Sequence, residues 1–200
     1  MDWNRSQRAL IKLAREPFTG CALAVVQLET WGAGLTTALK FMERHPAPGA
    51  PRSVVLDGIS QWDTVRSLAK KCGRPGIGAG YFNTIHESIS RLSQDGKLPV
   101  SLWLEEARMM RPAAREMIFA QFAYVAEHCD FDIRVVFIIG KVSVWSNAKQ
   151  MREPGFPALG NRLVHRAQVI SFGKISCEEI EDTDGLEIAR EPVANIIKSA

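Results

Sequence analysis

The chain has 200 residues, of which 46% are hydrophobic and 24% are charged, and its formal net charge is +3 at pH 7. This mixture is typical of one globular domain that can bury a sizeable core, and it excludes a disordered chain. The net charge is too small to indicate nucleic-acid binding by itself. No apolar run approaches the roughly 20 residues that span a bilayer, and the charged N-terminus does not resemble a signal peptide.

Four cysteines are spread along the chain without a C-x-x-C pair: Cys21, Cys72, Cys129 and Cys177. Cys21 and Cys129 lie in or beside apolar runs, which favours buried free thiols over disulfides. We therefore expect a reduced, cytoplasmic protein that does not contact a membrane.

Strands and helices are predicted to alternate from the N-terminus onward. Residues 1–16 hold an amphipathic helix, with Trp3, Leu10 and Leu13 near one face and basic residues over much of the rest. The apolar run over residues 21–28 shows no alternation, as expected of a strand that is covered on both faces. The other predicted strands are residues 53–58, 99–106, 131–140 and 166–173, and the other predicted helices are 36–45, 60–73, 82–93 and 111–129.

This order predicts an α/β fold, a single P-loop NTPase-like domain with about five mainly parallel strands and helices on both faces. Residues 181–200 are too short for a full helical lid, so the lid is expected to be reduced to a short tail or absent. Sheets of this kind bind ligands at the carboxyl ends of their strands. Three segments converge there: Glu29–Thr37, Glu105–Glu106 and Gly140–Lys141.

The first of these segments resembles a phosphate-binding loop, in which Gly, four residues, Gly, Lys and Ser or Thr join a strand to a helix. The matching residues are Gly32, Gly34, Thr36 and Thr37. Glu29 replaces the first glycine of the pattern, and Leu35 replaces the lysine that would neutralise the phosphates. Two interpretations stay open, a phosphate site that has lost its cation and an ordinary turn from strand to helix.

The second segment is an apolar strand that ends in two acidic residues. Such a strand resembles the second motif of nucleotide-binding sites, which implies that Glu105 would hold Mg²⁺ together with the hydroxyl of Thr36 and that Glu106 would be the base that polarises water. The alternative is a strand that meets solvent with a charged pair.

Three cations further along the chain are candidates for the same site. Lys141 could stand in for the missing lysine, and Arg162 or Arg166 could reach the nucleotide of a neighbouring subunit. Each could equally be a solvated surface residue. The four histidines share no metal-binding spacing.

In the order of these motifs, residues 15–180 resemble the AAA+ ATPases of DNA transposition, the accessory ATPases of Mu-like phages and related transposons. The resemblance implies ATP and Mg²⁺ as cofactors, with Gly34 and Thr36 in the phosphate loop, Glu105 and Glu106 as metal-binding acid and base, and Arg162 or Arg166 as the intersubunit arginine. It also implies an oligomer that acts with DNA and a transposase.

The missing lysine leads to two hypotheses about function. The first is a degenerate AAA+-type protein of a mobile genetic element, which acts with DNA or a transposase and binds nucleotide weakly or not at all. The second is a catalytically inactive P-loop-fold interaction module that regulates a partner ATPase or another protein. Under both hypotheses Leu35 and Glu29 impair ATPase activity, and a protein without any cofactor is as consistent with the sequence as one that binds ATP.

Overall fold

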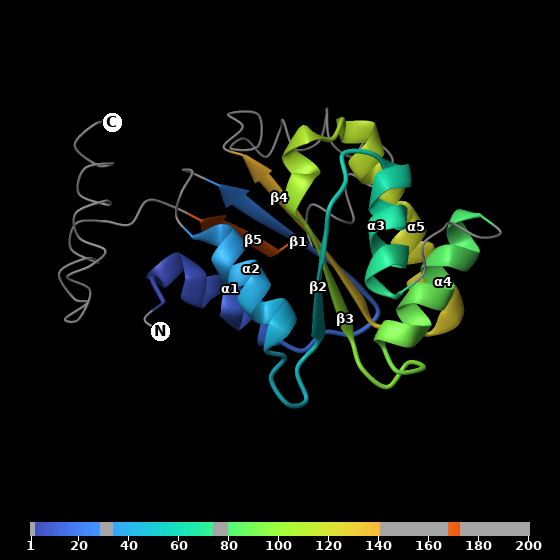
Figure 1. The fold of residues 1–200 in the computed structure, drawn as a ribbon, viewed down its shortest axis with the longest axis horizontal. Coiled ribbons are helices and arrows are strands. Elements are labelled where there is room, and N and C mark those ends of the chain that lie inside the picture. Colours follow the sequence, from blue (N-terminus) through green and yellow to red (C-terminus); the bar gives the residue numbers. More distant parts are fainter. Residues whose placement is uncertain (1–2, 29–33, 74–79, 141–167, 173–200) are drawn as a thin grey trace.

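The computed structural model of the chain describes residues 3–28, 34–73, 80–140 and 168–172. Their helices and strands form one sheet with helices packed on its two faces (Figure 1). In chain order the elements are α1 (Arg5–Arg15), β1 (Cys21–Leu28), α2 (Leu35–Arg44), β2 (Arg52–Leu56), α3 (Gln61–Lys71), α4 (Tyr81–Leu92), β3 (Val100–Leu104), η1 (Glu105–Met109), α5 (Pro112–Cys129), β4 (Ile133–Gly140) and β5 (Gln168–Phe172).

The sheet has five strands in the order β2-β3-β4-β1-β5, and every pair is parallel. At its carboxyl edge, Leu28 of β1 lies beside Gly140 of β4 and Phe172 of β5. Leu104, the last residue of β3, lies beside Phe137. The predicted α/β fold with five parallel strands and helices on both faces is confirmed. The tail over residues 181–200, where a lid was expected to be reduced or absent, lies outside the described residues.

Alternate residues of each central strand face opposite helical layers. In β3, Leu102 and Leu104 pack into the cluster under α3, α4 and α5, whereas Trp103 between them packs into the cluster under α1 and α2. Both clusters are closed to water, and Trp103 is fully buried. Covering on both faces is why these strands are apolar at consecutive positions. Figure 1 shows the two helical layers on either side of the sheet.

The boundaries of two predicted elements need correction. Helix α1 covers Arg5–Arg15 rather than the whole of residues 1–16, and it begins at Arg5 because the Asn4 side chain accepts a hydrogen bond from the backbone of Gln7 and caps the helix. The strand predicted over residues 99–106 ends at Leu104, and Glu105 and Glu106 lie in the 3₁₀ helix η1.

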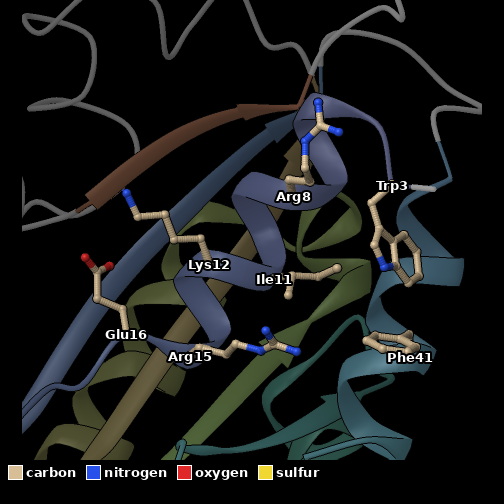
Figure 2. A pocket seen from close by; sticks show the side chains of 7 residues that line it. All are labelled: Trp3, Arg8, Ile11, Lys12, Arg15, Glu16 and Phe41. Carbon is tan, nitrogen blue, oxygen red and sulfur yellow. The ribbon is translucent and has the colours of Figure 1, made fainter. Parts of the chain in front are cut away.

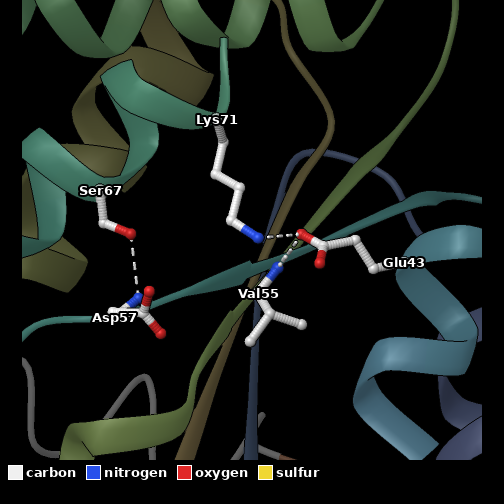
Figure 3. A network of polar contacts seen from close by, with 5 residues as sticks. All are labelled: Glu43, Val55, Asp57, Ser67 and Lys71. Atoms are coloured by element: carbon white, nitrogen blue, oxygen red, sulfur yellow. Dashed lines mark hydrogen bonds and ion pairs between the residues drawn. The ribbon is translucent and has the colours of Figure 1, made fainter. Parts of the chain in front are cut away.

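Side chains cover the free edge of the sheet at β2. The backbone N–H of Val55 donates to a Glu43 carboxylate oxygen at 3.1 Å, and the same oxygen lies 2.7 Å from Lys71 Nζ (Figure 3). The backbone N–H of Asp57, just after the strand, donates to the Ser67 hydroxyl at 3.0 Å. These contacts block the N–H groups with which another strand would pair.

The cysteines of the described residues are free, as expected, but Cys21 and Cys129 are half-buried rather than fully buried. Burial, and to a smaller extent the charge of Glu127, raises the pKa of Cys21 to about 12. Cys177 lies outside the described residues. None of the helices in the described part of the chain combines the length and apolar character that a bilayer-spanning helix needs.

Candidate functional site

The carboxyl edge of β1 lies at a switch point of the sheet. The chain leaves β1 through α2 and reaches β2 at one edge, whereas β5 returns to the other side of β1. Open parallel sheets bind ligands at such points. The turn into α2 is therefore the first place to look for a site.

This turn ends at Gly34, whose left-handed backbone (φ 78°) favours glycine over residues with a side chain. Gly34 caps α2 without a side-chain hydrogen bond, and its carbonyl accepts from Ala38 at 3.1 Å. The N–H groups of the first turn of α2 lie at the carboxyl edge of the sheet. Such a helix end carries a partial positive charge and attracts anions.

Thr36 and Glu105 meet at this edge, as the sequence predicts for a phosphate-loop hydroxyl and its acidic partner. The Thr36 hydroxyl donates to a Glu105 carboxylate oxygen at 2.8 Å, although the two residues are 69 positions apart. Thr36 is exposed in the first turn of α2, and Glu105 is half-buried directly after β3. A hydroxyl beside a carboxylate is the kind of oxygen pair that Mg²⁺ accepts.

Other predicted site residues lie nearby in different surroundings. Glu106 follows in η1 and is half-buried, and Thr37 is exposed on α2. Leu35, in the position of the expected lysine, is half-buried and packs against the apolar cluster under α1 and α2. It supplies no charge to an anion at the end of the helix.

Glu29, Gly32, Lys141, Arg162 and Arg166 lie outside the described residues. Their roles stay predictions.

The structure adds Gln7 to the site. Its amide nitrogen donates to the Gly34 carbonyl at 3.1 Å, and its amide oxygen accepts from the Asn4 backbone at 3.1 Å. Gln7 is buried, so α1 is tied to the turn that starts α2. The spacing Asn4-x-x-Gln7 is a capping-box pattern and could have located the start of the helix. Nothing in the pattern points to Gly34.

Arg115 is a second residue that sequence reasoning missed. It is buried on α5 and donates to the carbonyls of Ala107 at 3.0 Å and Met110 at 2.9 Å. Burial lowers the pKa of its guanidinium. Arg115 thereby holds η1, which carries Glu105 and Glu106, against the core.

Comparisons with known proteins agree with this fold. No family model matches the chain, and no curated protein matches it in sequence. Among solved structures, it is similar to the ORC2 protein of Aeropyrum pernix in its ADP form, with a TM-score of 0.60 at 14% identity, covering 94% of this chain and 50% of that one. It is also similar to the Aeropyrum pernix ORC1 protein in complex with DNA (TM-score 0.59, 14% identity, 95% and 48% covered). A third similar structure is Cdc6p of Pyrobaculum aerophilum (TM-score 0.54, 15% identity, 88% and 46% covered).

The chain spans about half the length of these structures. At such low identity the likeness shows the fold alone. That fold is an α/β fold with a parallel sheet of five strands and helices on both faces.

Proposed function

We propose that this chain is a degenerate AAA+-type protein that binds a Mg²⁺–nucleotide weakly at the start of α2 and acts in association with DNA. The observation that carries the nucleotide site is the 2.8 Å hydrogen bond between Thr36 and Glu105. It joins the two residues that the phosphate-loop and acidic motifs assign to the metal, at the edge where parallel sheets bind ligands.

Thr36 and Glu105 fit the part of such a site that would hold Mg²⁺. No group of three or more His, Cys, Asp or Glu side chains within the described ranges could hold a metal ion. A hydroxyl and one carboxylate would therefore need phosphate oxygens and water to complete the shell. Mg²⁺ is commonly held in this way, by one or two carboxylates together with substrate phosphates.

The part of the site that would bind the phosphates is weaker than in a complete phosphate loop, because Leu35 replaces the lysine. Leu35 cannot pair with a phosphate, and losing one charged hydrogen bond costs about 1.5–3 kcal/mol. This corresponds to roughly a tenfold to hundredfold loss of affinity. We therefore propose nucleotide binding without efficient turnover.

Two further observations support association with DNA. The similar ORC1 structure was solved with DNA, and the order of motifs resembles that of transposition ATPases. On that resemblance we propose a transposase of a mobile element as the protein partner and an oligomer as the assembled form.

Titration of the protein with Mg·ATP and Mg·ADP, followed by calorimetry and thermal unfolding, tests the nucleotide site. We expect a small nucleotide-dependent stabilisation that disappears in Thr36→Val and in Glu105→Gln. Thr19→Val is a matched control, because Thr19 is exposed at the opposite end of β1. Leu35→Lys should increase the affinity about tenfold or more, by one charged contact.

Equal binding by Thr36→Val and the wild type would refute the proposed site. Absence of binding in both the wild type and a folded Leu35→Lys variant would also refute it. That result would favour the second candidate, an inactive interaction module that regulates a partner. The packing of Leu35 against the apolar cluster supports this candidate, because a residue used in packing has no part in nucleotide binding.

A further inference from the structure

A groove runs along the outer surface of α1 where this helix meets α2. It encloses about 560 Å³ (Figure 2). Its lining comprises three basic residues, Arg8, Lys12 and Arg15, and three apolar residues, Trp3, Ile11 and Phe41. We call it the α1–α2 groove. Figure 2 shows Arg15 extending toward Phe41, with Trp3 above that ring.

The basic residues form a single stripe on α1. Arg5, Arg8, Lys12 and Arg15 follow one another at spacings of three, four and three residues and are all exposed. This spacing places them on one face of the helix. From Arg8 to Arg15 the stripe is roughly 10 Å long at 1.5 Å per residue.

One acidic residue, Glu16, also lines the groove. It lies on the side away from Trp3 and Phe41 (Figure 2). Its charge also acts on the buried Arg134. Burial lowers the pKa of that guanidinium, and the charge of Glu16 partly offsets the effect. The basic stripe therefore keeps an excess of positive charge.

Helix stability explains Lys12 and Arg15, which are favoured in the last turn of α1, but it does not explain Arg5 and Arg8. The first turn of α1 contains no acidic residue. The N-terminus of the helix carries a partial positive charge, which disfavours Arg5 and Arg8. Four like charges on one face also repel one another. An anionic partner would relieve both costs.

The apolar side of the groove continues as a row of rings. The ring centroids of Trp3 and Phe41 are 4.8 Å apart, and those of Phe41 and His45 are 4.9 Å apart. Trp3 and Phe41 are half-buried, and His45 is exposed, so part of each ring surface is accessible. Nucleobases stack on rings of this kind.

From these observations we infer that the α1–α2 groove binds a single-stranded nucleic acid, with phosphates on the basic stripe and bases against Trp3 and Phe41. A basic track beside stacking rings is the arrangement that holds single strands. A paired duplex hides its bases and would use only the basic stripe. The roughly 10 Å from Arg8 to Arg15 is long enough for the stripe to contact consecutive phosphates of one strand. This inference deepens the DNA association proposed above and does not depend on the nucleotide site.

Fluorescence anisotropy with a labelled short oligothymidylate, at low salt and without nucleotide or Mg²⁺, tests the groove. We expect Arg8→Glu/Lys12→Glu to weaken binding about tenfold or more and to reduce the slope of log K against log salt by about 1.4, which is 0.7 for each of two lost cations. Phe41→Leu, which keeps an apolar side chain but removes the ring, should weaken binding about fivefold or more.

Arg66→Glu/Lys70→Glu on α3 makes the same charge change at the same spacing, on exposed residues of the opposite helical layer. It should leave the affinity within about twofold, apart from the general effect of net charge. Arg8→Glu suits the start of the helix, whereas Lys12→Glu removes a favourable cation from its last turn, so the folding of the variant is measured directly. Circular dichroism and thermal unfolding check this.

Four results would overturn the inference. The first is absence of wild-type binding at low salt. The second is an equal loss in the α1 and α3 variants, which would indicate non-specific charge attraction. The third is competition by a duplex as strong as that of the single strand, with Phe41→Leu unchanged. The fourth is binding of the oligonucleotide by the wild type and equally well by the groove variants, in which case association with DNA stands and the groove is refuted. These results do not depend on the outcome of the Mg·ATP titration, because the oligonucleotide assay contains neither nucleotide nor Mg²⁺.

Discussion

Replacing Gly34 with alanine tests how tightly α1 is joined to the turn before α2. A Cβ atom at this position would lie 2.3 Å from the amide nitrogen of Gln7, which is far too close. Gln7 can move aside only by losing hydrogen bonds, because its amide oxygen accepts from Asn4 and its amide nitrogen donates to Gly34. The left-handed backbone of Gly34 adds strain to any side chain placed there.

The expected cost can be worked out from these contacts. A left-handed conformation costs an L-residue about 1–2 kcal/mol, and a lost hydrogen bond costs about 0.5–1.5 kcal/mol. Gly34→Ala should therefore lower the free energy of unfolding by about 1.5–3.5 kcal/mol. For a chain of this size, the midpoint of thermal unfolding should fall by about 3–14 °C.

A double-mutant cycle with Gln7→Ala separates the two contributions, with urea unfolding as the measurement. In the Gln7→Ala background, Gly34→Ala should cost only the backbone strain, about 1–2 kcal/mol, since no amide remains for the Cβ atom to meet. The coupling energy should be about 1 kcal/mol. An equal cost of Gly34→Ala in both backgrounds would show that Gln7 does not contact the turn in solution.

Three further predictions concern the core, the sheet edge and a thiol. Arg134 is buried and donates to the carbonyls of Leu13 and Glu16 at the end of α1. Arg134→Met should therefore lower the free energy of unfolding by about 1.5–3 kcal/mol. An unchanged urea midpoint would contradict this contact. Glu43→Ala should expose the backbone N–H of Val55 at the sheet edge and increase self-association measured by light scattering, whereas Glu43→Gln, which still offers an oxygen, should not. Because burial raises the pKa of Cys21 from 9.0 to about 12, the protonated thiol should react slowly with a disulfide reagent at mildly alkaline pH. The stability it contributes should be complete below pH 9 and decline as the pH rises toward 12, and Cys21→Ala should remove this dependence; fast labelling of the folded protein would contradict the raised pKa.

Much of the fold could be predicted because strands that are buried on both faces are apolar at consecutive positions. The apolar run over residues 21–28 coincides with β1, and the long helix predicted over 111–129 begins only one residue later, at Pro112. Capping and turn residues gave a less accurate prediction of where elements end. Glu105 and Glu106 read as the end of a strand, although Arg115 holds the carbonyls of η1 and stabilises a helical turn there.

The candidate site was predicted in part. Thr36 and Glu105 could be assigned to one edge, because the carboxyl ends of parallel strands converge, and the structure places them in hydrogen-bonding contact. The direction of Leu35 could not be read from the loop pattern, since the first residue of a helix can face either solvent or the core. Its place against the α1–α2 cluster depends on how the two helices pack.

The sequence by itself determined which segments are strands and helices, that the sheet is parallel, and where polar residues follow buried strands. These properties depend on the local alternation of apolar and polar residues and on short connections. Only the tertiary structure decided the strand order, the link from Gln7 to Gly34, and the alignment of the basic stripe of α1 beside the rings of Trp3 and Phe41. The strand order, the contact of Gln7 with Gly34 and the place of Phe41 beside α1 each join residues far apart in the chain. A periodic pattern specifies which face of an element is buried but not which element lies against it.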